Sequence, residues 1–104
     1  MAAERRRHAL LYGLHVTDQA LYAEYRAHMK PILKEFGGDF AYDFVVGEVL
    51  RSEVDHPINR VFTITFPDAG AAERFFGNER YLAVRAKYFE PGVARTTRLA
   101  VFDE

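Results

Sequence analysis

The fold is decided by Arg60-Val61-Phe62-Thr63-Ile64-Thr65-Phe66. Large apolar side chains at positions 62, 64 and 66 alternate there with Val or Thr at positions 61, 63 and 65. Because successive side chains of a β-strand point to opposite faces, the stretch predicts a strand with one large apolar face and one smaller face. Pro67 and Asp68 follow at once and suit the start of a helix, through a fixed φ and a capping carboxylate.

Outward from this strand, three further segments alternate in the same way and predict strands, at residues 8–16, 40–47 and 93–102. Two helices are predicted between them. Apolar residues recur three or four positions apart from Leu21 to Phe36, after a cap at Thr17 or Asp18 and before a stop at Gly37-Gly38. The second helix begins at residue 68, breaks at 77–78 and continues to about residue 89.

The strand predicted at residues 40–47 has two faces of different chemistry. The alternation assigns Phe40, Tyr42, Phe44 and Val46 to one face and Ala41, Asp43 and Val45 to the other. We expect the aromatic set to pack on the core and the second set to lie on the opposite face of the sheet.

The order strand, helix, strand, strand, helix, strand predicts an α+β, ferredoxin-like βαββαβ fold, a four-stranded antiparallel sheet with both helices on one face. The other face would expose Leu11, Ala41, Val45, Val61, Ala94, Ala100 and Phe102. Burying several hundred Å² of it would contribute on the order of 10 kcal/mol before association costs, at roughly 25 cal/mol per Å². We therefore expect a homodimer, paired sheet to sheet into a dimeric α/β barrel with a small cavity between the sheets.

The composition bounds the organisation and the partners. The 104 residues suffice for one core, so we expect a single domain over residues 8–104 after a flexible arm over residues 1–7. The absence of cysteine excludes disulfides and thiolate metal sites. A net charge of -1 does not favour nucleic acid as a partner. No apolar run approaches the roughly 20 residues that span a membrane, and we expect a cytoplasmic protein.

Several short motifs, in their order and spacing, resemble the DUF1330 family of small uncharacterised proteins: Leu14-His15-Val16-Thr17-Asp18, Tyr22, Tyr25, Pro31, Gly37-Gly38, Phe66-Pro67-Asp68, Phe75-Phe76 and Tyr81. The resemblance implies the dimeric α/β-barrel superfamily, whose branches include cofactor-free monooxygenases, muconolactone-isomerase-like enzymes, polyketide cyclases and haem-handling proteins. It implies no particular reaction. Many relatives place an arginine about two helical turns after the equivalent of Tyr81, where this chain has Tyr88; Arg85 lies one turn earlier.

Two residues are candidate catalytic groups. The alternation places His15 on the face where the cavity is expected, and an imidazole with a pKa of about 6.5 exchanges protons at neutral pH. A histidine hydrogen-bonded across the dimer is the alternative. Asp43 is expected on the same face, where a carboxylate is costly unless paired. It is therefore either a base or half of a structural ion pair with Arg98, Arg95 or the partner subunit.

Four more residues are candidates for ligand binding. Thr63 and Thr65 lie on the smaller face of the central strand, and Arg98 would orient an anion. Tyr22 lies beside the apolar stripe of the first helix, where it would either cap the barrel mouth or simply pack in the core or at its rim. The histidines have no metal-ligand spacing, so neither a metal nor another cofactor is expected.

Three functions fit these residues. The first is a cofactor-free enzyme, monooxygenase-, isomerase- or cyclase-like, acting on a small hydrophobic or aromatic molecule in the inter-sheet cavity. The second is non-catalytic binding of such a ligand, and the third a structural dimer. The resemblance implies Trp and Asn near a monooxygenase pocket. This chain has no Trp, and its Asn59 and Asn78 fall in predicted loops, which weakens that branch.

Overall fold

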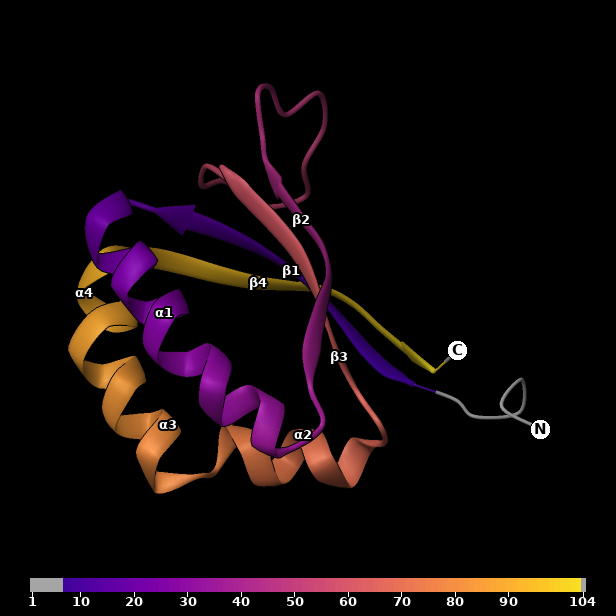
Figure 1. The fold of residues 1–104 in the computed structure, drawn as a ribbon. Helices are drawn as coiled ribbons and strands as arrows, with labels where there is room; N and C mark the ends of the chain where they lie inside the picture. Colours follow the sequence, from indigo (N-terminus) through magenta and orange to yellow (C-terminus); the bar gives the residue numbers. More distant parts are fainter. Residues whose placement is uncertain (1–6, 104) are drawn as a thin grey trace.

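A computed structural model describes residues 7–103 and confirms the predicted α+β, ferredoxin-like architecture (Figure 1). Residues 1–6 of the predicted arm lie outside the described residues. The elements in chain order are β1 (His8–Val16), α1 (Gln19–Glu35), β2 (Asp39–Val45), β3 (Arg60–Phe66), α2 (Ala69–Phe76), α3 (Glu79–Val84), the π-helical turn η2 (Arg85–Phe89), the single turn α4 (Glu90–Gly92) and β4 (Val93–Asp103).

The strands form one antiparallel sheet in the order β2-β3-β1-β4, and the helices cover one of its faces (Figure 1). We call that side the helix face and the other side the open face. The central strands β3 and β1 pair from His8 opposite Phe66 to Leu14 opposite Arg60. The alternation of β3 is confirmed, since Phe62, Ile64 and Phe66 are buried in the core beneath the helices.

The predicted caps form as local sequence requires. The Asp18 carboxylate accepts a hydrogen bond from the Leu21 N–H at 3.0 Å, and Asp68 does the same for Ala71 at 2.7 Å. After α1, Gly37 adopts a φ of 76°, where a Cβ would also stand 2.7 Å from the Pro67 ring. A side chain there would be strained on both counts, which is why glycine ends this helix.

The second helical segment is less regular than predicted. From Arg85 to Phe89 the backbone makes a π-helical turn, closed by a bond from the Glu90 N–H to the Arg85 carbonyl. Such turns insert one extra residue into a helix and are frequent at functional sites. Here the turn sets the direction of the Arg85 and Phe89 side chains.

The core between sheet and helices is largely aromatic. Phe75 is fully buried, with its ring centroid 4.3 Å from that of Tyr81 and 5.7 Å from that of Phe66. Deleting a ring of this kind leaves a cavity that neighbouring rings cannot fill. This cluster fixes α2 and α3 against β3, and so fixes the helical wall of any space above the sheet.

The predicted faces of β2 are wrong beyond Phe40. Phe40 pairs with Ile64, but the next pair is Tyr42 with Thr63, so Ala41 is an extra, unpaired residue. A bulge of this kind moves every later side chain to the other face. Tyr42 and Phe44 therefore lie on the open face, 63% and 56% exposed, although the alternation had assigned them to the core. Asp43 lies opposite Phe62 on the helix face.

Candidate ligand pocket between the sheet and the helices

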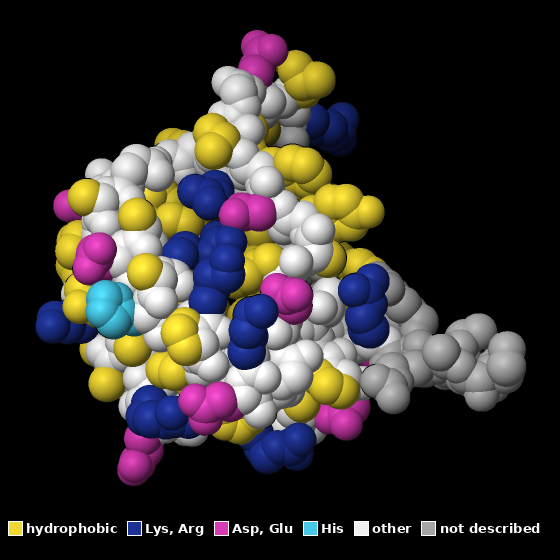
Figure 2. Space-filling view, in the orientation of Figure 1, with side chains coloured by type: hydrophobic (Ala, Val, Ile, Leu, Met, Phe, Trp, Pro, Cys, Tyr) yellow, Lys and Arg dark blue, Asp and Glu magenta, His cyan; other side chains and the backbone are white. Residues whose placement is uncertain are grey.

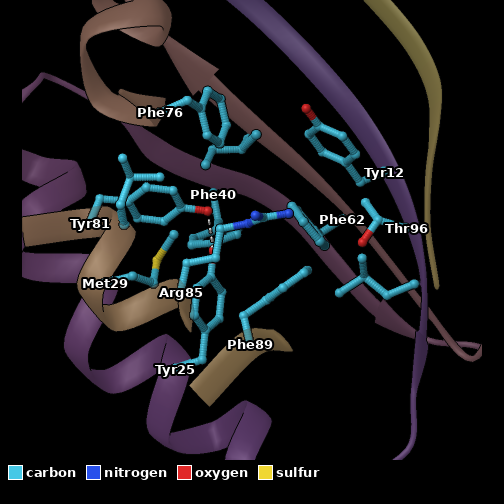
Figure 3. Close-up of a pocket in the computed structure, with 13 residues that line it drawn as sticks. Tyr12, Tyr25, Met29, Phe40, Phe62, Phe76, Tyr81, Arg85, Phe89 and Thr96 are labelled. Carbon is cyan, nitrogen blue, oxygen red and sulfur yellow. Dashed lines mark hydrogen bonds between the residues drawn. The ribbon is translucent and has the colours of Figure 1, made fainter. Parts of the chain in front are cut away.

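A pocket of about 270 Å³ lies between the helix face of the sheet and the helices that cover it (Figure 3). Every strand and most of the helical segments contribute to its wall. Its lining consists of Tyr12, Leu14, Tyr25, Met29, Phe40, Phe62, Ile64, Phe76, Tyr81, Leu82, Arg85, Phe89 and Thr96. Most of these side chains are apolar or aromatic, so the interior suits a flat, mainly apolar molecule.

Two tyrosine hydroxyls meet at the helical wall of the pocket. The hydroxyls of Tyr25, from α1, and Tyr81, from α3, are 2.9 Å apart in a buried hydrogen bond. Burial raises the pKa of Tyr25 well above its ordinary value and also raises the pKa of Tyr81, against the opposing effects of the hydrogen bond from Tyr25 and the charge of Arg85. Both phenols therefore stay protonated at neutral pH; one hydroxyl donates to the other, and the accepting hydroxyl keeps its own proton for a ligand.

Tyr12 brings a third hydroxyl from β1 on the opposite wall (Figure 3). Burial raises the pKa of Tyr12, and the charges of Arg98 and Arg85 oppose that rise. This phenol also stays protonated at neutral pH, so it too is a donor.

Arg85 is the cationic group of the pocket lining, and its guanidinium reaches inward between the aromatic rings (Figure 3). Its side chain is 41% exposed, and Nη1 lies 3.4 Å from a carboxylate oxygen of Glu90, a long contact. The guanidinium also lies 5.3 Å from the centre of the Phe89 ring. This weakly paired cation, in a lining that also holds phenol hydroxyls, favours a ligand with a negative oxygen.

The lining contains no histidine and no carboxylate. Among the residues that the structure describes, no group of three or more His, Cys, Asp or Glu side chains is arranged to hold a metal ion. The pocket therefore offers phenol hydroxyls and a guanidinium, groups that stabilise negative charge on a bound molecule. A base would come from the molecule itself or from water.

The residues predicted to share one cavity are divided between the two faces of the sheet. Thr63 and Thr65 lie on the open face as predicted; both are buried. His15 also lies there, opposite Arg95 of β4. Arg98 is opposite Tyr12, three pairs along β1 and β4 from His15, and it lines a hollow with Val61, Thr97 and Leu99. The bulge at Ala41 places Asp43 on the helix face, just as it places Tyr42 on the open face.

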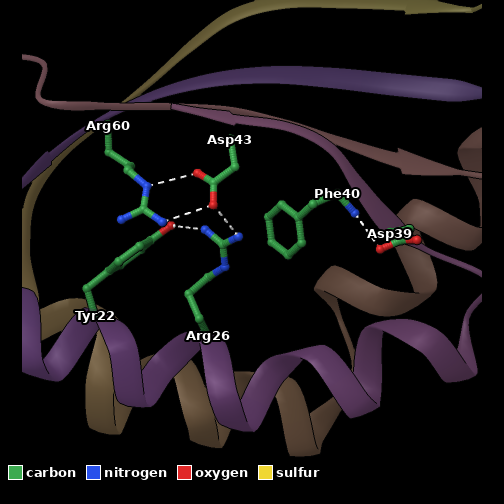
Figure 4. Close-up of polar contacts among 6 residues, drawn as sticks. All are labelled: Tyr22, Arg26, Asp39, Phe40, Asp43 and Arg60. Carbon is green, nitrogen blue, oxygen red and sulfur yellow. Dashed lines mark hydrogen bonds and ion pairs between the residues drawn. The ribbon is translucent and has the colours of Figure 1, made fainter. Parts of the chain in front are cut away.

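Asp43 belongs to an ion-pair cluster beside α1 (Figure 4). Arg60 donates from Nε and Nη2 to its two oxygens at 2.8 and 2.9 Å, and Arg26 Nη2 donates to one of them at 2.8 Å. The predicted partners Arg98 and Arg95 are thus wrong. The hydrogen bond from Arg60, with that from Arg26, holds the pKa of Asp43 below its ordinary value against an opposing effect of burial, so this carboxylate is a weak base.

Tyr22 lies in the same cluster. It is buried, and its hydroxyl accepts a hydrogen bond from Arg26 Nη1 at 2.8 Å. The lining of the aromatic pocket contains none of the six predicted site residues.

Sequence reasoning missed Tyr25, Tyr81 and Arg85 as one site. A signal for part of it was present, because Tyr81 and Arg85 are four residues apart and so share one face of a helix. Tyr25 was assigned to the apolar stripe of the first helix, where only its hydroxyl distinguishes it from a core residue.

Comparisons with known proteins agree with this fold. The family described as "Domain of unknown function (DUF1330)" matches residues 10–97. No curated protein matches the chain. Within residues 7–103, none of the helices is both long and apolar enough to cross a membrane.

Solved structures with the same fold share little sequence with this chain. A protein of unknown function from Rhodopseudomonas palustris, RPA0582, has a TM-score of 0.77 at 14% identity over 97% of this chain and 82% of its own. A putative antibiotic biosynthesis monooxygenase from Nitrosomonas europaea has a TM-score of 0.61 at 17% identity, over 96% and 90%. SnoaB, a cofactor-independent oxygenase from Streptomyces nogalater, has a TM-score of 0.55 at 13% identity, over 93% and 89%.

Proposed function

This chain belongs to the DUF1330 family, and from that premise we propose that its helix-face pocket binds a small, flat, mainly apolar molecule carrying one negative oxygen. The observation that carries the proposal is the weakly paired guanidinium of Arg85 among aromatic rings and three phenol hydroxyls. A carboxylate, phenolate or enolate of an aromatic molecule has the matching chemistry.

The size and lining of the pocket support this class of ligand. About 270 Å³ is close to the lower end of the range, roughly 300–1,000 Å³, found for small-molecule sites. The Phe40 and Phe62 rings, with centroids 5.4 Å apart, form an apolar floor on the sheet. A polar or bulky molecule would lose hydration there without gaining partners.

We propose further that the bound molecule reacts without a cofactor, through its own enolate or phenolate. A water molecule would take the proton lost from the bound molecule, and Arg85 and the Tyr81 hydroxyl would donate hydrogen bonds to the developing negative oxygen, a contribution that is large in an apolar site. An enolate is common to monooxygenase-, isomerase- and cyclase-like reactions. The likeness in fold to SnoaB supports this class, and non-catalytic binding in the same pocket is the alternative.

The active species in this proposal is a homodimer. Tyr42, Phe44, Leu99 and Phe102 are large apolar side chains, each exposed by more than two fifths, and in the register of the sheet they belong to the open face. Pairing with the open face of a second copy would remove them from water. The buried Thr63 and Thr65 and half-buried His15 would then lie at this interface rather than in the ligand pocket.

Binding is tested with 2-naphthoate and its uncharged analogue 2-naphthamide as probes, using calorimetry. Arg85→Gln is expected to weaken binding of the carboxylate at least about tenfold, since a charge-assisted hydrogen bond contributes roughly 1.5–3 kcal/mol. Binding of the amide should hardly change.

Arg80→Gln is the matched control, because Arg80 lies on the same helical segment but pairs with Glu35 outside the pocket. Equal losses for both probes, or for both variants, would remove Arg85 from the site and end the proposal.

Catalysis is separated from binding by deuterium uptake at C1 of 2-tetralone, an enolisable aromatic ketone, followed by NMR in D₂O. The wild-type chain should accelerate the exchange, and Tyr81→Phe should slow it while leaving ketone affinity within about threefold. A wild-type rate equal to that of buffer would leave binding as the function.

A further inference from the structure

Apart from the aromatic pocket, a separate hollow of about 350 Å³ lies between α1 and Arg60, the first residue of β3. Lys and Arg side chains gather on this side of the molecule, with an acidic one among them (Figure 2). The hollow is lined by Gln19, Tyr22, Ala23, Arg26, Lys30 and Arg60. We call it the α1 groove; its lining shares no residue with that of the aromatic pocket.

The α1 groove carries more positive than negative charge. Arg26, Arg60 and Lys30 supply three cations, whereas Asp43, behind the two arginines, is the carboxylate of the cluster. The two oxygens of Asp43 already accept three hydrogen bonds from arginine nitrogens. One carboxylate therefore orients two guanidiniums and leaves two positive charges uncompensated.

Donors remain free on the side of the groove. Arg60 uses Nε and Nη2 for Asp43, and Nη1 points away from that carboxylate (Figure 4). Within residues 7–103, neither this nitrogen nor Lys30 has a hydrogen-bond or ion-pair acceptor. Lys30 lies one helical turn after Arg26, so both project from the same side of α1.

The two guanidiniums are held in place before any ligand arrives. The Arg26 guanidinium lies 3.7 Å from the centre of the Phe40 ring and donates to the Tyr22 hydroxyl, and the Arg60 guanidinium lies 5.0 Å from the centre of the Tyr22 ring. Side chains that are already fixed lose little entropy when they bind an anion. Arg26 Nε is buried without a hydrogen-bond partner among residues 7–103.

We propose that the α1 groove is an anion site for a phosphate or carboxylate group of a small molecule, bound by Arg60 Nη1, Lys30 and the Gln19 amide. A guanidinium N–H and an ammonium together match a group with two or more charged oxygens. The site is independent of the aromatic pocket and of any reaction there.

The test is an NMR titration of the ¹⁵N-labelled protein with inorganic phosphate and, separately, with acetate, at an ionic strength held constant with chloride. Saturable shifts are expected at Gln19, Ala23 and the Arg60 side chain. Saturation with phosphate alone assigns the site to phosphoryl groups, with acetate alone to carboxylates, and with both to either oxyanion.

Variants establish where the anion binds. Lys30→Gln should weaken binding at least threefold, and because this side chain is exposed and unpaired in the described chain the fold should be unaffected. Lys34→Gln, one turn further along α1 and outside the groove, is the matched control. Arg60→Lys, which keeps the charge and removes the Nη1 donor that the bonds to Asp43 hold in place, should also weaken binding.

Shifts that never saturate, or that fall equally in Lys30→Gln and Lys34→Gln, would show general screening and overturn the proposal. Arg85→Gln should leave phosphate affinity unchanged, which separates this outcome from failure of the aromatic pocket.

Discussion

The two faces of the sheet carry similar side chains in opposite surroundings. On the helix face, Phe66 of β3 and Phe75 of the overlying α2 are almost completely buried. On the open face, Tyr42 and Phe44 stack on one another with centroids 6.0 Å apart and remain more than half exposed. The difference shows that residue type does not decide which face becomes the core. Helices cover one face and leave the other uncovered in the single chain (Figure 1).

Truncating one ring on each face should separate a core residue from an interface residue. Phe75→Ala is expected to lower the free energy of unfolding by about 3–5 kcal/mol, through lost burial and the cavity left behind. Phe44→Ala should lower it only at concentrations where the dimer forms. Urea unfolding at two protein concentrations checks both, and a concentration-independent loss for Phe44→Ala would place that ring in the core of one subunit.

A charge on the open face should break the proposed dimer. Phe44→Arg is expected to raise the dimer dissociation constant at least about 100-fold, because an unpaired charge would be buried at the interface. Analytical ultracentrifugation measures the change, and Ala27→Arg on the exposed side of α1 is the control. A wild-type chain that stays monomeric at high concentration would remove the dimer from the proposal.

Asp43, whose carboxylate lies on the helix face because of the bulge in β2, should stabilise the fold modestly. Asp43→Asn is expected to cost about 1–2 kcal/mol, less than fully buried charge-assisted bonds because the side chain is partly exposed. Asp103→Asn, which removes an exposed contact with His8, should cost less than about 0.5 kcal/mol.

The contribution of Asp43 should also depend on pH in a defined direction. Because Arg60 and Arg26 lower the pKa of Asp43 in the folded chain, its contribution is complete above the unfolded pKa of about 3.9 and is lost as the pH falls through the folded value. The difference in unfolding free energy between wild type and Asp43→Asn should therefore be constant from pH 7 to about 5 and shrink below about 4. A difference that grows on acidification would contradict this assignment.

The sequence by itself determined the order of strands and helices, the two capping aspartates and the antiparallel sheet. These features depend on local periodicity and on side chains that bond to nearby backbone, as Asp18 and Asp68 do. They also carried the resemblance to the DUF1330 family, which the match over residues 10–97 confirms.

Only the tertiary structure decided the site. The alternation of residues 40–46 is unbroken, so nothing local reveals that Ala41 is left unpaired when β2 aligns with β3. The sequence does not reveal the π-helical turn that directs Arg85 either, because the same residues suit several helical hydrogen-bond patterns. Strand register and helical phase are set by contacts between distant segments. Register places Asp43 beside Arg60, and helical phase places Arg85 among the tyrosines of the pocket.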